Sequence, residues 1–198
     1  ASVVADRAQA AAAALAPLCE RGCDCADASW DLGIAVDYDN PQAVGIDRLL
    51  AAAAAYALEA GRGGAVVADA GTALTVDAVD AGGTFRGGMI MPGLRLGLEA
   101  LHAGTSLLPA IELRGDVPPL GRSTAACMLA GAVRGTAAML SALHTVLATH
   151  LNQSLALYLT GGDGPVLAPF VGPAARLEPD LVLAGLAAAL GRRPAAAP

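Results

Sequence analysis

The most informative segment of this 198-residue sequence is Asp69-Ala70-Gly71-Thr72-Ala73-Leu74-Thr75-Val76-Asp77. An apolar run ends at Asp69, a Gly-Thr turn follows and a second extended run begins, which predicts two strands joined by a tight turn. The backbone amides and the hydroxyl of such a turn can approach a phosphate, while the carboxylate can hold a cation against it. A plain hairpin with a polar turn would show the same residues, so the segment by itself leaves both interpretations open.

The segments on either side of this turn predict a mixed α/β fold. A short extended segment is expected at Ser2–Val4, and strands are expected over residues 33–38, 65–69, 73–79, 84–91 and 155–159. The strands at residues 65–69, 73–79 and 84–91 are expected to form a meander. Helices are expected over residues 6–18, 45–60, 94–101, 124–151 and 179–190. The Gly-rich turn at residues 61–64 marks the expected boundary between two lobes, residues 1–64 and 65–198.

Composition and charge narrow the choice of partners. The net charge is −6 and the acidic residues are scattered, so no basic groove interleaved with aromatic residues indicates nucleic-acid binding. The apolar runs at residues 49–58 and 181–190 are shorter than the roughly 20 residues of a membrane span. The Ala-rich start lacks the order of regions typical of a signal peptide. We therefore expect a protein with no nucleic-acid or membrane partner.

The cysteines indicate a reducing compartment. Cys19, Cys23, Cys25 and Cys127 form no CxxC pair and have no nearby His at the spacing of a zinc site. Reduced thiols are the simpler interpretation, and they are typical of cytoplasmic proteins. The expected localisation is therefore the cytoplasm.

A second motif, Gly45-Ile46-Asp47-Arg48, opens the helix expected over residues 45–60. An Asp at a helix start followed by a solvated Arg is the simpler interpretation of the spacing alone. The functional alternative is that Asp47 takes a proton from a substrate hydroxyl while the planar fork of Arg48 holds a substrate carboxylate.

Further motifs follow in order, and each has a structural explanation when taken singly. They are the Gly-rich segment at residues 87–93, the loop at residues 105–109, Gly121-Arg122-Ser123-Thr124 before the long helix, and Thr160-Gly161-Gly162-Asp163 after a buried strand. Turn glycines and a helix cap account for most of them. The last is also the kind of loop that brings backbone close to a nucleotide.

Taken together, the motifs resemble the type III pantothenate kinase family, which also contains the Bvg accessory factors. The matching segments are Tyr38-Asp39-Asn40-Pro41, Gly45-Ile46-Asp47-Arg48, Asp69-Ala70-Gly71-Thr72-Ala73, residues 88–93, residues 105–109, Ser123-Thr124 and Thr160-Gly161-Gly162-Asp163. They span nearly the whole chain and occur in the order found in the family.

The resemblance implies the actin-like fold of the acetate kinase, hexokinase and actin superfamily: two ribonuclease-H-like lobes with ATP between them, usually in a homodimer. Residues 1–64 would then finish the first lobe and residues 65–198 would form the second. The implied reaction is the ATP-dependent phosphorylation of the primary hydroxyl of pantothenate to 4'-phosphopantothenate, the first step of coenzyme A biosynthesis.

The resemblance also implies roles for individual residues. Asp47 matches the general base, and the residues that match pantothenate contacts are Tyr38, Gly45, Ile46, Asp47, Arg48 and, across the dimer interface, Thr124. Asp69 matches the ligand of a monovalent cation, K+ or NH4+, and Mg2+ would accompany ATP. The expected ATP contacts are Gly71, Thr72, Gly161 and Gly162.

One departure from the family pattern concerns the first phosphate-binding loop. Family members begin with a strand and an Asp-x-Gly-Asn-Thr type loop, whereas Ala1-Ser2-Val3-Val4 resembles a later strand of the family. We therefore expect an incomplete first lobe, which puts the activity of this chain in question. Three alternatives stay open: a regulatory or binding homologue without catalysis, another sugar- or acyl-kinase-like member of the superfamily, and a structural oligomerisation module.

Overall fold

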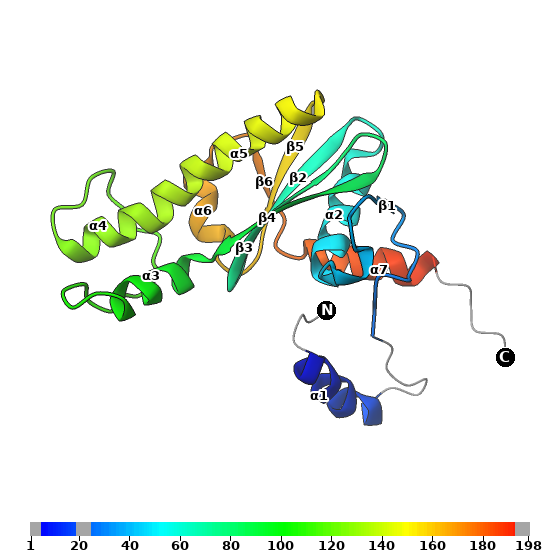
Figure 1. Ribbon diagram of the computed structural model, residues 1–198, viewed down its shortest axis with the longest axis horizontal. Helices are drawn as coiled ribbons and strands as arrows, with labels where there is room; N and C mark the ends of the chain where they lie inside the picture. Colours follow the sequence, from blue (N-terminus) through cyan, green and yellow to red (C-terminus); the bar gives the residue numbers. More distant parts are fainter. Residues whose placement is uncertain (1–4, 19–24, 193–198) are drawn as a thin grey trace.

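The computed structural model describes residues 5–18 and 25–192 and shows a mixed α/β architecture (Figure 1). The strands are β1 (Ala35–Val36), β2 (Gly64–Ala70), β3 (Ala73–Val79), β4 (Thr84–Pro92), β5 (Leu155–Thr160) and β6 (Ala175–Leu177). The helices are α1 (Ala5–Leu15), α2 (Ile46–Glu59), α3 (Leu94–Ala103), α4 (Thr124–Ala130), α5 (Thr136–Leu151), α6 (Gly164–Val171) and α7 (Leu181–Arg192). The shorter helical segments are the 3-10 turns Ala16–Leu18 and Pro41–Ala43 and the π-helical segment Gly131–Gly135.

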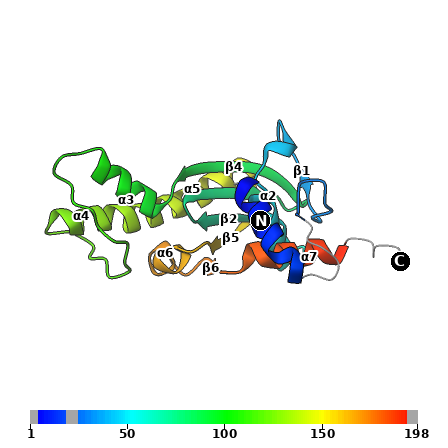
Figure 2. The ribbon, with the colours of Figure 1, turned by 90° about the horizontal axis from the view of Figure 1, so that it is seen from below.

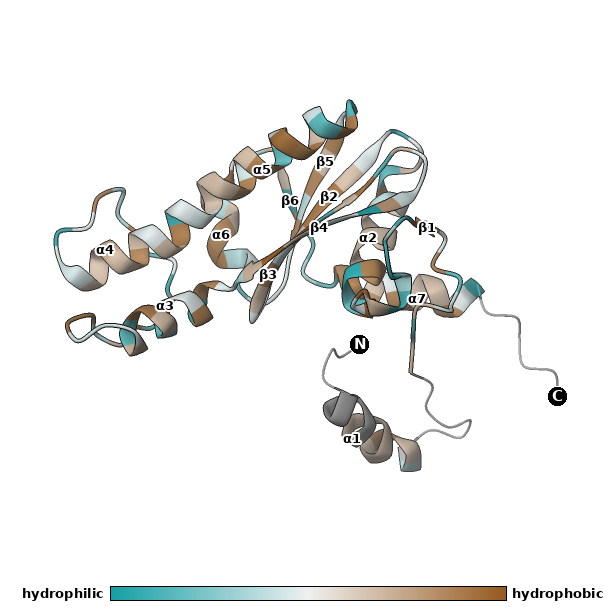
Figure 3. Ribbon diagram, in the orientation of Figure 1, coloured by the Kyte–Doolittle hydropathy of each residue, from teal (hydrophilic) through white to brown (hydrophobic). Residues whose placement is uncertain are grey.

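The described strands form one six-stranded sheet in the order β1-β4-β3-β2-β5-β6. The predicted meander is confirmed, since β2 pairs with β3 and β3 with β4, both antiparallel. On the other side β2 pairs with β5 and β5 with β6, both parallel. β2 is therefore an inner strand of the sheet, whose strands carry apolar residues, brown in Figure 3. The apolar residues of β2 are buried on both faces.

Alternation along β2 divides the core between two layers of helix. Ala65 and Val67 point to one face of the sheet, where they pack with the buried residues of α2 and α7. Val66 and Ala68 point to the other face, which α5 and α6 cover. The run of alanines in α2 lets α7 approach closely, so that a β-carbon on Gly185 would meet the backbone of Leu50.

The helix predicted over residues 124–151 is confirmed as one continuous helical run, with a π-helical segment between α4 and α5. Ser123 caps it, because its hydroxyl accepts a hydrogen bond from the backbone N–H of Ala126 at 3.2 Å. By length and composition this run of 28 residues could cross a membrane, a property that core helices of soluble proteins share. Together with α3, α4 extends away from the sheet (Figure 2).

Both predicted ends of the strand at residues 33–38 are wrong, and one helix and one strand were not predicted. β1 covers only two residues instead of residues 33–38, because Gly33 has φ +74° and the chain leaves the sheet edge after Asp37. α6 and β6 were not predicted; α6 contains Pro165 and Pro169, and β6 is short and mostly exposed. Ser2–Val4, Cys19 and Cys23 lie outside the described residues, while Cys25 and Cys127 are free thiols as expected.

Candidate active site

The first turn of α2 presents Asp47 and Arg48 to a cavity of about 580 Å³, which we call the α2 pocket. Gly45 caps the helix in an extended conformation, and the carboxylate of Asp47 accepts a hydrogen bond of 2.9 Å from the backbone N–H of Arg48. The N-terminus of a helix is a favourable place for an acidic side chain, because the helix dipole is positive there. The lining residues are Ala26, Asp27, Ala28, Gln42, Ala43, Val44, Gly45, Ile46, Asp47, Arg48, Ala73, Thr75 and Ile90.

The guanidinium of Arg48 makes a buried ion pair with Asp77 of β3. Its Nε donates to both carboxylate oxygens, at 3.1 and 3.0 Å, and its Nη2 donates to Oδ1. The side chains are 9% and 2% exposed. Asp77 and, to a smaller extent, Tyr38 raise the pKa of Arg48 above its usual range. In the functional alternative considered for this motif, the planar fork of Arg48 holds a substrate carboxylate; in the structure one edge of that fork is already paired with Asp77.

The negative charges of three carboxylates, Asp47, Asp69 and Asp77, act on one another near this ion pair. Burial raises the pKa of Asp69 above its usual range, and the negative charges of Asp47 and Asp77 raise it further. Burial also raises the pKa of Asp77, against the opposing effect of Arg48. A site that penalises negative charge in this way is suited to a cation that is supplied from outside the chain.

Asp69, at the end of β2, faces the turn at Gly161. Gly161 has φ +86°, and a β-carbon there would stand 2.4 Å from Oδ1 of Asp69 and 2.6 Å from the backbone of Ala70. The backbone N–H of Asp163 donates to the carbonyl of Ala70 at 2.9 Å. The predicted turn at residues 160–163 therefore packs directly against the end of β2. This close approach is possible because Gly161 has no side chain.

A second cavity, about 340 Å³, lies beside this turn and is called the turn pocket here. Its lining residues are Ala70, Gly71, Thr72, Arg95, Leu96, Glu99, Gly162 and Asp163. Nε of Arg95 donates to the buried carboxylate of Asp163 at 3.0 Å, which links the first turn of α3 to the loop after β5. Arg95 adds an exposed positive charge to a lining that also carries the acidic residues Glu99 and Asp163.

The β2–β3 turn separates the two cavities. Ala73 lines the α2 pocket, and the residues immediately before it line the turn pocket. The structure thus brings together most of the predicted site residues: Gly45, Ile46, Asp47 and Arg48 on one side, Gly71, Thr72 and Gly162 on the other, and Asp69 and Gly161 at the junction. A ligand in each cavity would place its reacting group near this turn.

Besides Asp69 and Gly161 at the junction, two predicted residues, Tyr38 and Thr124, line neither cavity. Tyr38 is 40% exposed and packs against Gly87 and Phe85, with ring centroids 6.3 Å apart, next to Arg48 rather than in the lining of the α2 pocket. Thr124 begins α4, and Figures 1 and 2 show α4 at one end of the molecule, far from α2. A single chain does not bring Thr124 to the α2 pocket.

Three residues of the site had no predicted role: Asp77, Arg95 and Asp163. Asp77 is the last residue of the segment from Asp69 to Asp77. The signal available from the sequence was a carboxylate in a mostly apolar strand, two positions after Thr75. Within the described part of the chain, no group of three or more His, Cys, Asp or Glu side chains is arranged to hold a metal. A cation at Asp69 would need oxygen ligands from a substrate or water.

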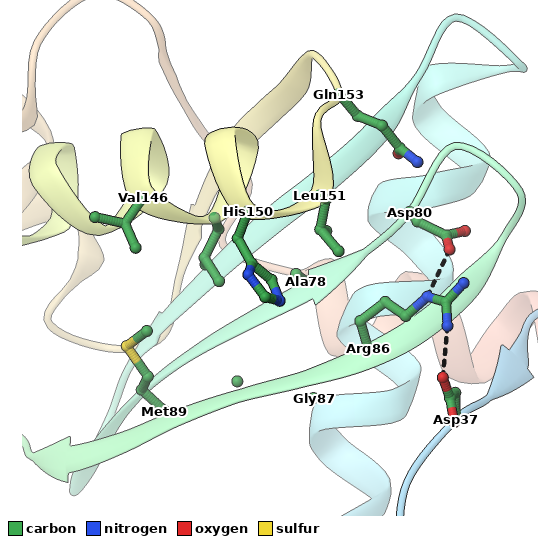
Figure 4. A pocket seen from close by; sticks show the side chains of 12 residues that line it. Asp37, Ala78, Asp80, Arg86, Gly87, Met89, Val146, His150, Leu151 and Gln153 are labelled. Carbon is green, nitrogen blue, oxygen red and sulfur yellow. Dashed lines mark hydrogen bonds and ion pairs between the residues drawn. The ribbon is translucent and has the colours of Figure 1, made fainter.

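A larger cavity, about 670 Å³, lies between the β3–β4 pair and the end of α5 (Figure 4). Arg86 crosses its rim, donating to Asp80 at 2.7 Å and to Asp37 at 2.5 Å. His150 and Leu151 extend from α5 toward the strands. None of the predicted site residues lines this cavity.

Comparison with known proteins identifies the family. A family model described as "Type III pantothenate kinase" matches residues 1–145. Proteins named type III pantothenate kinase are similar in sequence: 39% identity over 162 residues for one from Rubrobacter xylanophilus, covering 79% of this chain and 61% of that protein, and 40% over 156 residues for one from Sphingopyxis alaskensis, covering 78% and 59%. A relative from Paramagnetospirillum magneticum shares 34% identity over 191 residues, covering 94% and 73%.

A crystal structure from Campylobacter jejuni, described as a conserved Baf family transcriptional activator, is similar in fold. It shares 25% identity and a TM-score of 0.55, over 80% of this chain and 68% of that one. The chain spans about three fifths of the length of most of the curated relatives named here. The family match covers well over half of the chain. The chain therefore belongs to the type III pantothenate kinase family.

Proposed function

We propose that this chain carries the acceptor site and part of the nucleotide site of a pantothenate kinase, which phosphorylates the primary hydroxyl of pantothenate with ATP to give 4'-phosphopantothenate, the first step of coenzyme A biosynthesis. The observation that carries the proposal is the meeting of two cavities across the β2–β3 turn, with Asp47 in one and Thr72 in the other. Phosphoryl transfer requires this arrangement, because acceptor and donor must approach in line from two sides.

In the α2 pocket, Asp47 accepts the proton of the pantothenate hydroxyl as that oxygen attacks the γ-phosphate of ATP, and the bond from the γ-phosphorus to the β–γ bridging oxygen breaks. The pantothenate carboxylate pairs with Arg48, with Tyr38 beside it. Gly45 and Ile46 supply the wall of the pocket around the substrate chain. The contribution of the protein is mainly to orient the hydroxyl toward the phosphate.

The turn pocket receives the phosphates of ATP. Backbone at Gly71, Gly161 and Gly162 approaches them without side chains in the way, and the hydroxyl of Thr72 donates to them. Asp69 would hold a monovalent cation, K+ or NH4+, and Mg2+ would accompany ATP. The carboxylate of Asp69, at a site where neighbouring negative charges accumulate, suits a cation, whose charge would offset that of the phosphates.

The fold proposed is that of the actin-like superfamily, with residues 1–64 from the first ribonuclease-H-like lobe and residues 65–198 as the second. The meander β2–β3–β4 extended by parallel β5 and β6 supports this assignment for the second lobe. We place the protein in the cytoplasm without a nucleic-acid or membrane partner.

The active site is completed by a second copy of the chain, whose Thr124 reaches the pantothenate. Two observations support a homodimer. Thr124 is distant from the α2 pocket of its own chain. The same long helix exposes a row of small residues that allows close helix contact, namely Gly131, Gly135, Ala138 and Ala142.

Isothermal titration of pantothenate, in potassium buffer with Mg2+ and a non-hydrolysable ATP analogue, tests the proposal. We expect saturable binding by the parent chain and its loss in Arg48→Ala. Arg62→Ala is the control, because Arg62 is an exposed arginine beyond the other end of α2 and should leave binding unchanged. A folded, dimeric parent that releases no heat would contradict the proposal and favour a regulatory homologue without the substrate site.

A further inference from the structure

The ion pair between Arg48 and Asp77 joins a residue of the α2 pocket to a carboxylate in the sheet behind it. Arg48 lines the pocket and Asp77 does not. Both oxygens of Asp77 accept hydrogen bonds from Nε of Arg48, and Oδ1 also accepts from Nη2. The contact is thus made with one edge of the guanidinium, and the N–H groups of the other edge are not needed for it.

This arrangement fixes the direction of a long and otherwise flexible side chain. An arginine held along one edge by a carboxylate loses its rotamer freedom before a ligand arrives, so it presents its second edge in a defined orientation. Phe85 adds to this restraint, because the guanidinium carbon lies 5.7 Å from the centre of its ring. A carboxylate ligand in the α2 pocket would meet a guanidinium that is already oriented.

Attachment of α2 to the sheet does not by itself explain Asp77. The helix is already anchored by Leu49 and Leu50, both fully buried, and its far end is tied by Glu59 to Tyr158 and Arg176. Asp77 is nearly inaccessible to solvent, and burial and the charge of Asp47 both disfavour its ionised form. A carboxylate that is buried in this way lowers the stability of the fold. Its presence is therefore better explained by its effect on Arg48 than by the attachment of α2.

We propose that Asp77 is a positioning residue for substrate recognition: it holds Arg48 so that the edge of the guanidinium that Asp77 does not engage, beside Tyr38, pairs with the carboxylate of the acceptor in the α2 pocket. This inference rests on the proposed function and deepens it. Asp77 touches neither substrate nor nucleotide and acts through Arg48. Its removal should therefore affect recognition of the acceptor carboxylate rather than the rest of the acceptor.

Titration of two ligands separates this role from a structural one. Pantothenate carries the carboxylate, and panthenol, its primary alcohol analogue, does not; both are titrated in the presence of the ATP analogue, K+ and Mg2+. For Asp77→Asn we expect the Kd of pantothenate to rise at least about tenfold, because a charge-assisted pair is misoriented, while the Kd of panthenol changes less than about twofold.

The matched control is Glu59→Gln, which breaks the ion pair between the buried carboxylate of Glu59 and the half-exposed Arg176, at the end of α2 away from the pocket. It should lower the unfolding temperature and leave both Kd values unchanged. A purely structural Asp77 would behave in the same way as Glu59. Arg48→Lys is the second variant and tests the same edge-on pairing if Asp77→Asn does not fold; it keeps the charge, loses the fork and should weaken pantothenate binding to a similar extent.

The outcomes are distinct. Selective loss of pantothenate affinity in Asp77→Asn or Arg48→Lys supports the inference. A folded Asp77→Asn that binds pantothenate as tightly as the parent, or more tightly, overturns it, as does an Arg48→Lys that binds like the parent. A folded parent that binds no pantothenate overturns the proposed function itself, and this result is visible before any variant is measured.

Discussion

Oδ1 of Asp69 lies 2.4 Å from the place where a β-carbon on Gly161 would stand. The carboxylate that ends β2 and the glycine that follows β5 are adjacent because these strands are parallel neighbours, with Asp69 opposite Thr160. The absence of a side chain at Gly161 is therefore a condition for the position of Asp69.

Gly161→Ala should disturb both the fold and the nucleotide site. The residue has φ +86°, where an alanine costs about 1–2 kcal/mol, and its β-carbon would also press on Asp69 and the backbone of Ala70. We expect a loss of at least about 2 kcal/mol in the free energy of unfolding, measured by denaturant titration, and weaker binding of an ATP analogue. Gly162→Ala is the control for stability, since no atom lies within 4 Å of its β-carbon. Equal stability of the two variants would contradict this interpretation.

Asp69→Asn should make the chain more stable at neutral pH when no small cation is present. The folded pKa of Asp69 is raised by burial and then by Asp47 and Asp77. Its contribution to stability is thus fully present below the unfolded pKa and is lost as the pH rises through the folded pKa. The variant avoids that loss, and we expect its unfolding temperature at pH 7 to exceed that of the parent by on the order of 2 °C.

The difference between Asp69→Asn and the parent should shrink as the pH falls through the raised folded pKa of Asp69, because the parent carboxylate then becomes protonated. Thermal unfolding in chelator with tetramethylammonium as the only cation measures it across the range. An advantage that grows on acidification would show that Asp69 is stabilised, not strained, as a carboxylate.

The sequence predicted the central layer of the fold well and its edges poorly. The meander from β2 to β4 has strong strand periodicity and Gly-rich turns, so local pattern sufficed. β1 is short because pairing at a sheet edge depends on where the partner strand ends, which no local pattern specifies. β6 is held by its register with β5, a tertiary contact. For α6, the Gly-Pro pair at its start was a usable signal.

The parts of the site that one continuous segment forms could be predicted from the sequence. The contacts between segments that are distant in the sequence could not. Gly45-Ile46-Asp47-Arg48 and the β2–β3 turn each form one wall of a cavity. The pairing of Arg48 with Asp77 joins residues 29 positions apart, and that of Arg95 with Asp163 joins residues 68 apart. Such contacts depend on strand order and helix placement, so the sequence indicated Arg48 without showing that Asp77 already holds it, and it gave no role to Arg95.

Gly185→Ala should loosen the contact between α7 and α2. A β-carbon at Gly185 would stand 2.1 Å from the carbonyl oxygen of Leu50, and backbone cannot yield as a flexible side chain does. Overpacking of this kind typically costs about 1–3 kcal/mol, and we expect a loss in this range in the free energy of unfolding. Gly191→Ala, on the same helix with nothing within 4 Å, should be neutral or gain up to about 1 kcal/mol from helix propensity. Similar losses in both variants would show that propensity, not packing, governs α7.

Asp47→Asn should separate catalysis from binding. The substitution keeps the size of the side chain and its place in the first turn of α2, but it removes the group that accepts the substrate proton. A positioned general base contributes about 10²–10⁴-fold, so the pantothenate-dependent turnover of ATP should fall by at least about 10²-fold while the Kd of pantothenate changes less than about threefold. Asp39→Asn is the control, because Asp39 is an exposed acid outside both cavities. Turnover by Asp47→Asn equal to that of the parent would remove Asp47 from the mechanism, whereas a large loss of binding would assign it to substrate recognition instead.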